Sequence, residues 1–154
     1  MANIFIFGAG SMGTAFSFPC SDRKHSVTIV GTHLEDDFID LINKGKIHPG
    51  LNCKVPANVK FLKFGKIDEA FNNKVDLIVI AVSLKGIEWV SIELSKVLKK
   101  NIPILILTKG MTVNNNNYEM LPQTMERLLK KNGIKETNIS VAGGPCLAKG
   151  LANK

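Results

Sequence analysis

The stretch IFIFGAGSMG, residues 4–13, decides the fold of this chain. Four apolar residues predict a buried strand, and a G-x-G-x-x-G pattern follows at once at Gly8, Gly10 and Gly13. In a strand-turn-helix unit of this kind, the first glycine allows the tight turn and the second lets a pyrophosphate approach the backbone. The third lets the helix pack on the strand, and the helix N-terminus attracts phosphates. The motif therefore predicts a dinucleotide site at the start of the chain.

Apolar runs alternate with amphipathic stretches along the rest of the chain. Candidate strands lie near residues 3–7, 27–30, 59–62, 76–82, 103–107 and 139–142. Two runs, residues 77–82 and 104–107, are apolar throughout, as expected of strands buried on both faces. Strands that alternate with helices build parallel sheets. We therefore predict the α/β fold class: a doubly wound, Rossmann-type parallel sheet with helices on both faces.

Three local patterns bear on the segments between the strands. Residues 85–99 place apolar side chains on one face at helical spacing and predict a covering helix. Pro19 falls inside the helix expected after the glycine turn, so we expect a kink or a shortened helix there. The four asparagines of residues 114–117 predict a surface loop ahead of the next helix.

The chain is expected to form one domain. Its 154 residues, 45% of them hydrophobic, suffice for a single domain with a core of its own. Beyond the last candidate strand, nothing after Gly150 resembles a completed structural element. We therefore expect residues 1–154 to be a dinucleotide-binding domain, cut at the start of the linker to a second domain.

The net charge of +7 comes almost wholly from lysine, since Arg23 and Arg127 are the only arginines. Nucleic-acid sites usually depend on arginine forks and clustered basic or aromatic surfaces, and the sequence has none, so no nucleic-acid partner is expected. A modest positive field attracts a small polyanion such as a dinucleotide or a phosphorylated metabolite. A lysine-rich composition spread over solvated faces is the simpler explanation of the charge.

Metal, disulfide and membrane functions are not indicated. Cys20, Cys53 and Cys146 are widely spaced without a CxxC pair, and the three histidines share no metal-ligand spacing. We expect reduced thiols and no metal site.

The longest apolar run, residues 77–82, is far shorter than the roughly 20 residues that a membrane helix needs. A cytoplasmic location without membrane insertion is therefore expected.

Cofactor choice is normally decided at the end of the second strand, where an acidic residue binds the ribose or a basic one receives a 2′-phosphate. Here the strand ends in Val30-Gly31-Thr32-His33. Thr32 could hydrogen-bond the ribose, and His33 could do so or touch a phosphate. We assign the acidic residues 35–37 to the first turn of the next helix. NAD is favoured, and NADP stays open.

Lys109 stands at the end of the predicted strand at residues 103–107, within LTKGM. Open α/β sheets bind ligands at this edge, which favours a functional lysine. A lysine that merely extends from the sheet edge into solvent is an equally good interpretation from spacing alone.

Several motifs together resemble the N-terminal domain of the NAD(P)-dependent glycerol-3-phosphate dehydrogenase family, over essentially the whole chain and in the family's order. These motifs are GAGSMGTA, VTIVGT, HPGLNCKVPANVKF, DLIVIAVS, LTKGM and the terminal AGGPCLAKG. The sequence departs from the family pattern at several positions. It lacks the basic residue often found near Thr32, which weakens the case for NADP, and Cys146 replaces a serine or threonine.

The resemblance implies that Lys109 meets both nicotinamide and substrate, as the catalytic residue that this domain contributes. Gly144 and Cys146 would border the substrate. With the glycine turn and the second strand end, the expected cofactor-binding residues are Gly8, Gly10, Ser11, Met12, Gly13, Thr32, His33, Ser83, Lys109 and Ala148.

The family's reaction moves a hydride between C2 of glycerol 3-phosphate and C4 of the nicotinamide and gives dihydroxyacetone phosphate. The resemblance implies that a lysine of the second domain handles the hydroxyl proton, so the 154-residue chain should bind cofactor without turning over substrate. A homodimer of the full-length enzyme is left open. Two alternatives remain: a stand-alone, non-catalytic dinucleotide-binding module, and the N-terminal domain of a ketopantoate-reductase-like dehydrogenase.

Overall fold

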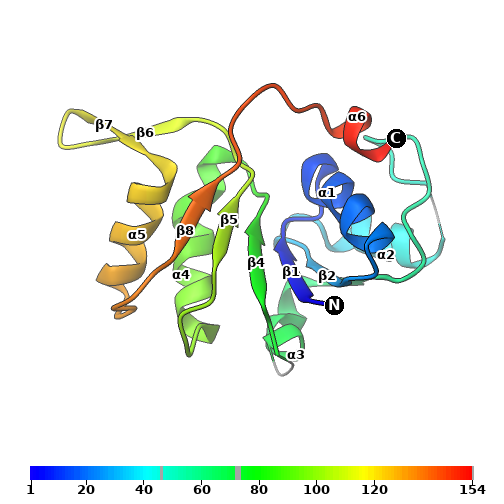
Figure 1. The fold of residues 1–154 in the computed structure, drawn as a ribbon, viewed down its shortest axis with the longest axis horizontal. Helices are drawn as coiled ribbons and strands as arrows, with labels where there is room; N and C mark the ends of the chain where they lie inside the picture. Colours follow the sequence, from blue (N-terminus) through cyan, green and yellow to red (C-terminus); the bar gives the residue numbers. More distant parts are fainter. Residues whose placement is uncertain (46, 72–73, 154) are drawn as a thin grey trace.

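The computed structural model describes residues 1–45, 47–71 and 74–153, and its centre is a parallel sheet (Figure 1). Its strands are β1 (Asn3–Phe7), β2 (Ser26–Val30), β3 (Val59–Leu62), β4 (Leu77–Ile80), β5 (Ile104–Ile106) and β8 (Ile139–Val141). All six lie where the apolar runs predicted them. The strand order is β3-β2-β1-β4-β5-β8, and every neighbouring pair is parallel.

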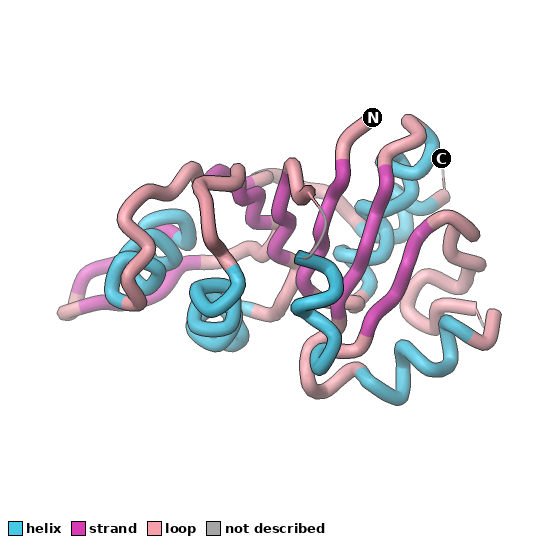
Figure 2. Tube along the Cα trace, turned by 90° about the horizontal axis from the view of Figure 1, so that it is seen from below, coloured by secondary structure: helices cyan, strands magenta, loops and turns pink. Residues whose placement is uncertain are grey.

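Helices cover both faces of this sheet (Figures 1 and 2). One face carries α1 (Ser11–Asp22) and α2 (Asp36–Asn43). The other carries α3 (Ile67–Phe71), α4 (Ile87–Val97) and α5 (Leu121–Lys131). The predicted doubly wound α/β fold is thereby confirmed, and α4 is the covering helix predicted at residues 85–99.

The alternation of side chains along β1 connects the two halves of the core. Phe5 and Phe7 are buried among the side chains of α3, α4 and α5. Ile4 and Ile6 point to the opposite face and pack with α1 and α2. Because successive residues of a strand face opposite sides, one continuous apolar run fills both layers of the core. The glycine turn that follows β1 is therefore held by packing from both sides.

Pro19 does not shorten the first helix, so that half of the prediction is wrong, whereas a kink at Pro19 stays a prediction. Helix α1 continues past Pro19 to Asp22, and the carbonyl of Pro19 accepts the N–H of Arg23 (3.2 Å). Proline removes one backbone donor, but the neighbouring Cys20 and the more distant Ala15 are buried. Packing of the apolar face outweighs the lost hydrogen bond.

The asparagine run is not a loop but the tip of a β-hairpin, which corrects the prediction for residues 114–117. Strands β6 (Met111–Asn114) and β7 (Asn117–Met120) are antiparallel, and Asn114 pairs with Asn117. Asn115 and Asn116 have φ values of 49° and 63°. Two left-handed residues in succession form the type I′ turn that suits a tight hairpin, and asparagine tolerates this conformation better than most residues.

The last segment of the chain crosses from β8 to the first helix, where α6 (Ala148–Ala152) ends beside α1 (Figure 1). Ala152 packs in a small apolar cluster with Ala15 and Leu51. Helix α6 begins before Gly150 and ends at Ala152, so among the described residues no element begins after Gly150. Among the described residues, no helix is long and apolar enough to cross a membrane.

Candidate functional site

The glycine turn lies where the strand order reverses, between β1 and its two neighbours β2 and β4. Gly8 has a φ of +108°, and its N–H donates to the carbonyl of Val30 (2.8 Å). A Cβ on Gly8 would lie 2.7 Å from the carbonyl oxygen of Ala81. A Cβ on Gly13 would collide with the carbonyl oxygen of Gly8. The folded backbone itself therefore requires glycine at positions 8 and 13.

Gly10 differs from the other two glycines of the motif. Its φ and ψ are −64° and 178°, a conformation open to any residue. Its Cβ would meet one atom within 4 Å, the Oε1 of Glu35 at 3.7 Å, which is ordinary contact. No packing contact among the described residues requires glycine here. A glycine at this place leaves room for a group from outside the chain to approach the backbone.

The N-terminus of α1 is open. Gly10 is the N-cap without a side-chain cap, and no acidic residue lies in the first turn. Among the hydrogen bonds of the described residues, none is donated by the N–H groups of Ser11, Met12 and Gly13. These three amides and the positive end of the helix dipole suit a phosphate group. The chain's own geometry therefore fits the pyrophosphate of a dinucleotide.

Glu35 is a site residue that the sequence reasoning missed. Its Oε2 accepts the N–H of Ala9 (3.1 Å) and the N–H of Thr32 (2.7 Å), so the carboxylate bridges the ends of β1 and β2. The assignment of Glu35 to the first turn of α2 is therefore wrong, whereas Asp36 and Asp37 do occupy that turn. Its position about 20 residues after the third glycine was the available signal.

The two residues predicted at the tip of β2 lie in different surroundings. Thr32 is half-buried, and its backbone contacts the Glu35 carboxylate. The ring of His33 contacts Trp89 edge to face, with the centroids 4.9 Å apart. Trp89 in turn packs against the core. Contact of Thr32 and His33 with a ribose stays a prediction.

Lys109 lies three residues after β5 and reaches across to the loop that follows β8. Its Nζ donates to the carbonyl oxygen of Gly144 and to that of Cys146, the latter at 3.4 Å. The structure thus brings together three residues predicted to border the substrate, although 35 positions separate Lys109 from Gly144. All three are exposed at the carboxyl edge of the sheet. Their contact with a substrate stays a prediction.

Ser83 and Ala148 complete the predicted cofactor residues. Ser83 is exposed and precedes the short helix η2 (Leu84–Gly86), at the same edge of the sheet. Ala148 begins α6 and packs against the cluster of Ala15 and Leu51. The structure places both residues on the carboxyl side of the sheet or beside α1, and their contact with a cofactor also stays a prediction.

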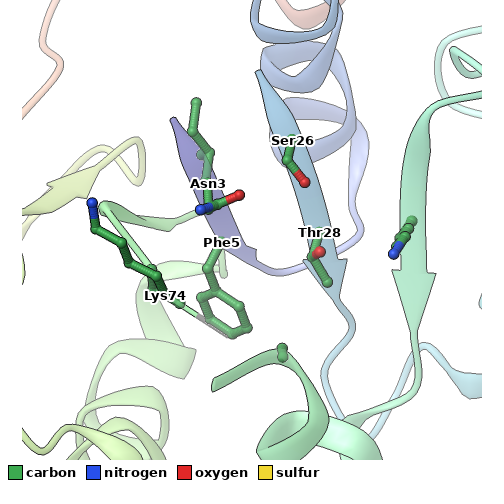
Figure 3. A pocket seen from close by; sticks show the side chains of 9 residues that line it. Asn3, Phe5, Ser26, Thr28 and Lys74 are labelled. Atoms are coloured by element: carbon green, nitrogen blue, oxygen red, sulfur yellow. The ribbon is translucent and has the colours of Figure 1, made fainter. Parts of the chain in front are cut away.

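A hollow of about 340 Å³ lies at the opposite, amino ends of the strands (Figure 3). Asn3, Ser26 and Thr28 contribute polar groups to it. Lys74 also lines it and forms an ion pair with Asp76 (3.0 Å). Ligands of open α/β sheets bind at the carboxyl ends, so this hollow is separate from the glycine turn. No cluster of potential metal ligands occurs among the described residues.

A parallel sheet in this order, with a glycine turn and an open helix N-terminus at its switch point, defines a dinucleotide-binding domain of the Rossmann class.

Comparison with known proteins identifies the family within that class. The family model of the NAD-dependent glycerol-3-phosphate dehydrogenase N-terminus matches residues 3–154, and the chain belongs to this family. The resemblance inferred from the sequence motifs is confirmed. The predicted nicotinamide cofactor is likewise that of the family.

The chain is 27% identical over 151 residues to the NADP(+)-dependent glycerol-3-phosphate dehydrogenase of Archaeoglobus fulgidus. The match covers 98% of this chain but 43% of the relative. The fold is also that of the Plasmodium falciparum glycerol-3-phosphate dehydrogenase, with a TM-score of 0.77, 20% identity, and coverage of 98% of this chain and 43% of that one. The chain thus spans less than half the length of these proteins.

The ketopantoate-reductase alternative has weaker structural support. An Enterococcus faecalis protein assigned as a 2-dehydropantoate 2-reductase matches with a TM-score of 0.61 and 22% identity, over 90% of this chain and 40% of that one. Both structural likenesses show the fold alone, and the family match decides between the two dehydrogenase classes.

Proposed function

We propose that this chain is the cofactor-binding half of an NAD(P)-dependent glycerol-3-phosphate dehydrogenase. The observation that carries the proposal is the N-terminus of α1 at Gly10. There the backbone conformation does not need glycine, and the three helix amides of Ser11, Met12 and Gly13 have no acceptor among the described residues. A pyrophosphate placed there receives hydrogen bonds from Ser11, Met12 and Gly13. Ser83 and Lys109, which follow β4 and β5 at the same edge of the sheet, are the residues that would hold the nicotinamide end of a bound cofactor.

Lys109 is the residue through which this half would act on the substrate. Its ammonium group already binds two carbonyl oxygens, those of Gly144 and Cys146, in a loop at the carboxyl edge. An oxygen of the substrate can take the place of one carbonyl. Lys109 would then orient the substrate oxygen and stabilise the negative charge that develops on it. The bound cofactor supplies the hydride chemistry, and the chain supplies position and charge.

The first prediction separates cofactor binding from turnover. We expect the 154-residue chain to bind NADH, seen as a change in nucleotide fluorescence, and to show no reduction of dihydroxyacetone phosphate. The chain spans 43% of its relative, and we assign the proton-transferring lysine to the remainder. A chimera that joins residues 1–154 to the second domain of a relative should recover turnover with this substrate.

Two results would contradict the proposal. A chain that leaves NADH fluorescence unchanged does not form the cofactor site. A folded chimera that reduces ketopantoate but not dihydroxyacetone phosphate assigns the chain to the other dehydrogenase class. A chimera with the same second domain joined to its own N-terminal half is the control for folding of the fusion.

Glu35 leads to the second prediction, a preference for NADH over NADPH. Its carboxylate lies between the ends of β1 and β2, where the adenosine ribose of a dinucleotide rests, and a 2′-phosphate there meets a like charge. We expect Glu35→Gln to lower the ratio of the NADPH and NADH dissociation constants by about tenfold, because one repulsive charge is lost.

The matched control for this test is Asp37→Asn, which removes an exposed carboxylate two positions further along α2. It changes the net charge equally without altering the bridge between Ala9 and Thr32. Both variants are titrated with both nucleotides. A ratio that changes equally in the two variants would assign the effect to overall charge rather than to Glu35.

A further inference from the structure

His48 is buried beside the glycine turn, and neither the motifs nor the proposed chemistry gives it a role. His48 is only 3% exposed to solvent, whereas His25 is half-buried and His33 is exposed. The Nδ1 atom accepts the backbone N–H groups of Gly50 (3.1 Å) and Leu51 (3.2 Å). A nitrogen that accepts two hydrogen bonds carries no proton.

The other ring nitrogen faces the nucleotide site. Nε2 lies 3.4 Å from the carbonyl oxygen of Ala9, the residue between the first two glycines of the turn. With Nδ1 unprotonated, Nε2 carries the hydrogen and donates it to Ala9. The Ala9 carbonyl also accepts the hydroxyl of Thr14 (2.9 Å), which belongs to α1. His48 therefore ties the turn to the loop that follows α2.

That loop also touches the helix N-terminus directly. Gly50 lies so close to Ser11 that a Cβ on Gly50 would collide with the Ser11 hydroxyl oxygen. The two N–H groups bound by Nδ1 belong to Gly50 and its neighbour Leu51. The imidazole thus fixes both the turn, through Ala9, and the backbone that packs against the first residue of α1.

We propose that His48 is a positioning residue for the dinucleotide: the neutral ring holds the 48–51 loop on the glycine turn, and protonation releases this arrangement and weakens cofactor binding. The inference rests on the proposed cofactor site. A proton on Nδ1 would face two N–H donors and displace both hydrogen bonds.

The groups around His48 favour its neutral form. Burial lowers the pKa of His48 from its ordinary value of 6.5, although the hydrogen bond with Ala9 and the charge of Glu35 oppose the shift. From α2, Phe38 packs against the ring edge to face, and within its own loop the backbone N–H of His48 donates to the carbonyl oxygen of Cys53 (3.0 Å). Because the pKa of His48 in the folded chain lies below 6.5, binding should be constant above this pH and decline as pH falls below it.

The test measures the dissociation constant of NAD+ by calorimetry from about pH 7.5 down to about pH 5.5, the range in which histidine titrates. For the wild-type chain we expect affinity to fall progressively below pH 6.5, by less than about tenfold at the acid end, because the loop loses two acceptors in the fraction of molecules whose ring is protonated. In His48→Gln, which cannot titrate but offers an acceptor oxygen, affinity should depend little on pH. In His48→Leu, which offers no acceptor, affinity should be about tenfold lower throughout.

His25→Gln is the matched control. His25 accepts the N–H of Ala2 (3.0 Å), far from the glycine turn, and its loss should leave the acid-side decline in place. A flat wild-type profile, or the same slope in His48→Gln as in the wild type, overturns the role of His48 while leaving the cofactor site intact. Absence of NAD+ binding at every pH overturns the cofactor site itself.

A second measurement needs no variant and decides the question even if His48→Gln fails to fold. If NAD+ binds the neutral form better, then bound NAD+ must lower the pH at which His48 titrates. The ring resonance of His48, followed by NMR with and without NAD+, should show this displacement to lower pH. An unchanged or raised titration point contradicts the proposal.

Discussion

Gly13→Ala lowers the free energy of unfolding by about 3 kcal/mol or more, the largest stability effect we expect from a single methyl group in this chain. The added carbon would collide with the carbonyl oxygen of Gly8 and lie 3.0 Å from the Cβ of Ala81. Gly8 cannot yield, because its own Cα faces Ala81 at the end of β4. Helix α1 must therefore move away from β1. Alanine's better helix propensity returns only about 1 kcal/mol.

Urea unfolding followed by circular dichroism measures this loss, and Gly65→Ala is the control. Gly65 has no atom within 4 Å of its added Cβ and no positive φ. We expect its substitution to change the free energy of unfolding by no more than about 0.5 kcal/mol. Equal stability of Gly13→Ala and the wild-type chain would mean that α1 and β1 do not approach as closely as the glycine turn requires.

The fold was largely predictable because its decisive signals are local. Each strand is a short apolar run, and β1 together with its glycine turn lies within residues 3–13. The two local errors have different causes. Pro19 was outweighed by packing of its helix, which sequence spacing does not show. Asn115 and Asn116 form a tight turn without glycine, so the usual hairpin signal was absent.

The site was predictable only in part, since its missing members act across long sequence separations. Glu35 reaches an amide 26 positions away, and His48 lies against a carbonyl 39 positions away. Both were visible as residue types, but a single sequence does not show which backbone groups their side chains meet. Lys109 was located by the end of its strand, whereas its contact with Gly144 depends on the pairing of β5 with β8.

The three glycines of one motif therefore have two different physical roles. Gly8 and Gly13 are required by contacts inside the chain, so substituting either of them should lower the free energy of unfolding. Gly10 has no such contact among the described residues, so its substitution should lower the affinity for the dinucleotide and leave the free energy of unfolding unchanged. The sequence motif treats the three positions alike. The structure distinguishes the two glycines that the fold needs from the one that only a bound ligand would need.

Gly10→Val is accordingly expected to lower NADH affinity by about 100-fold or more while leaving the free energy of unfolding within about 0.5 kcal/mol. At a φ of −64° and a ψ of 178° valine adopts the backbone of Gly10 without strain, and a Cβ at this position lies 3.7 Å from the Glu35 carboxylate. Its branched side chain, however, occupies the approach to the amides of Ser11 and Met12. Loss of two charge-assisted hydrogen bonds to a pyrophosphate accounts for the magnitude.

Nucleotide fluorescence and urea unfolding, measured on the same preparation, decide this prediction. Gly10→Ala is the graded control, because one methyl group fills less of the approach and should weaken binding less than valine does. If Gly10→Val binds NADH like the wild type, the pyrophosphate does not approach at Gly10 and the proposed site is wrong. If Gly10→Val loses as much free energy of unfolding as Gly13→Ala, then the fold itself requires Gly10. The approach of a ligand would then not be needed to explain the glycine. Only the combination of retained stability and lost affinity supports a cofactor resting on the N-terminus of α1.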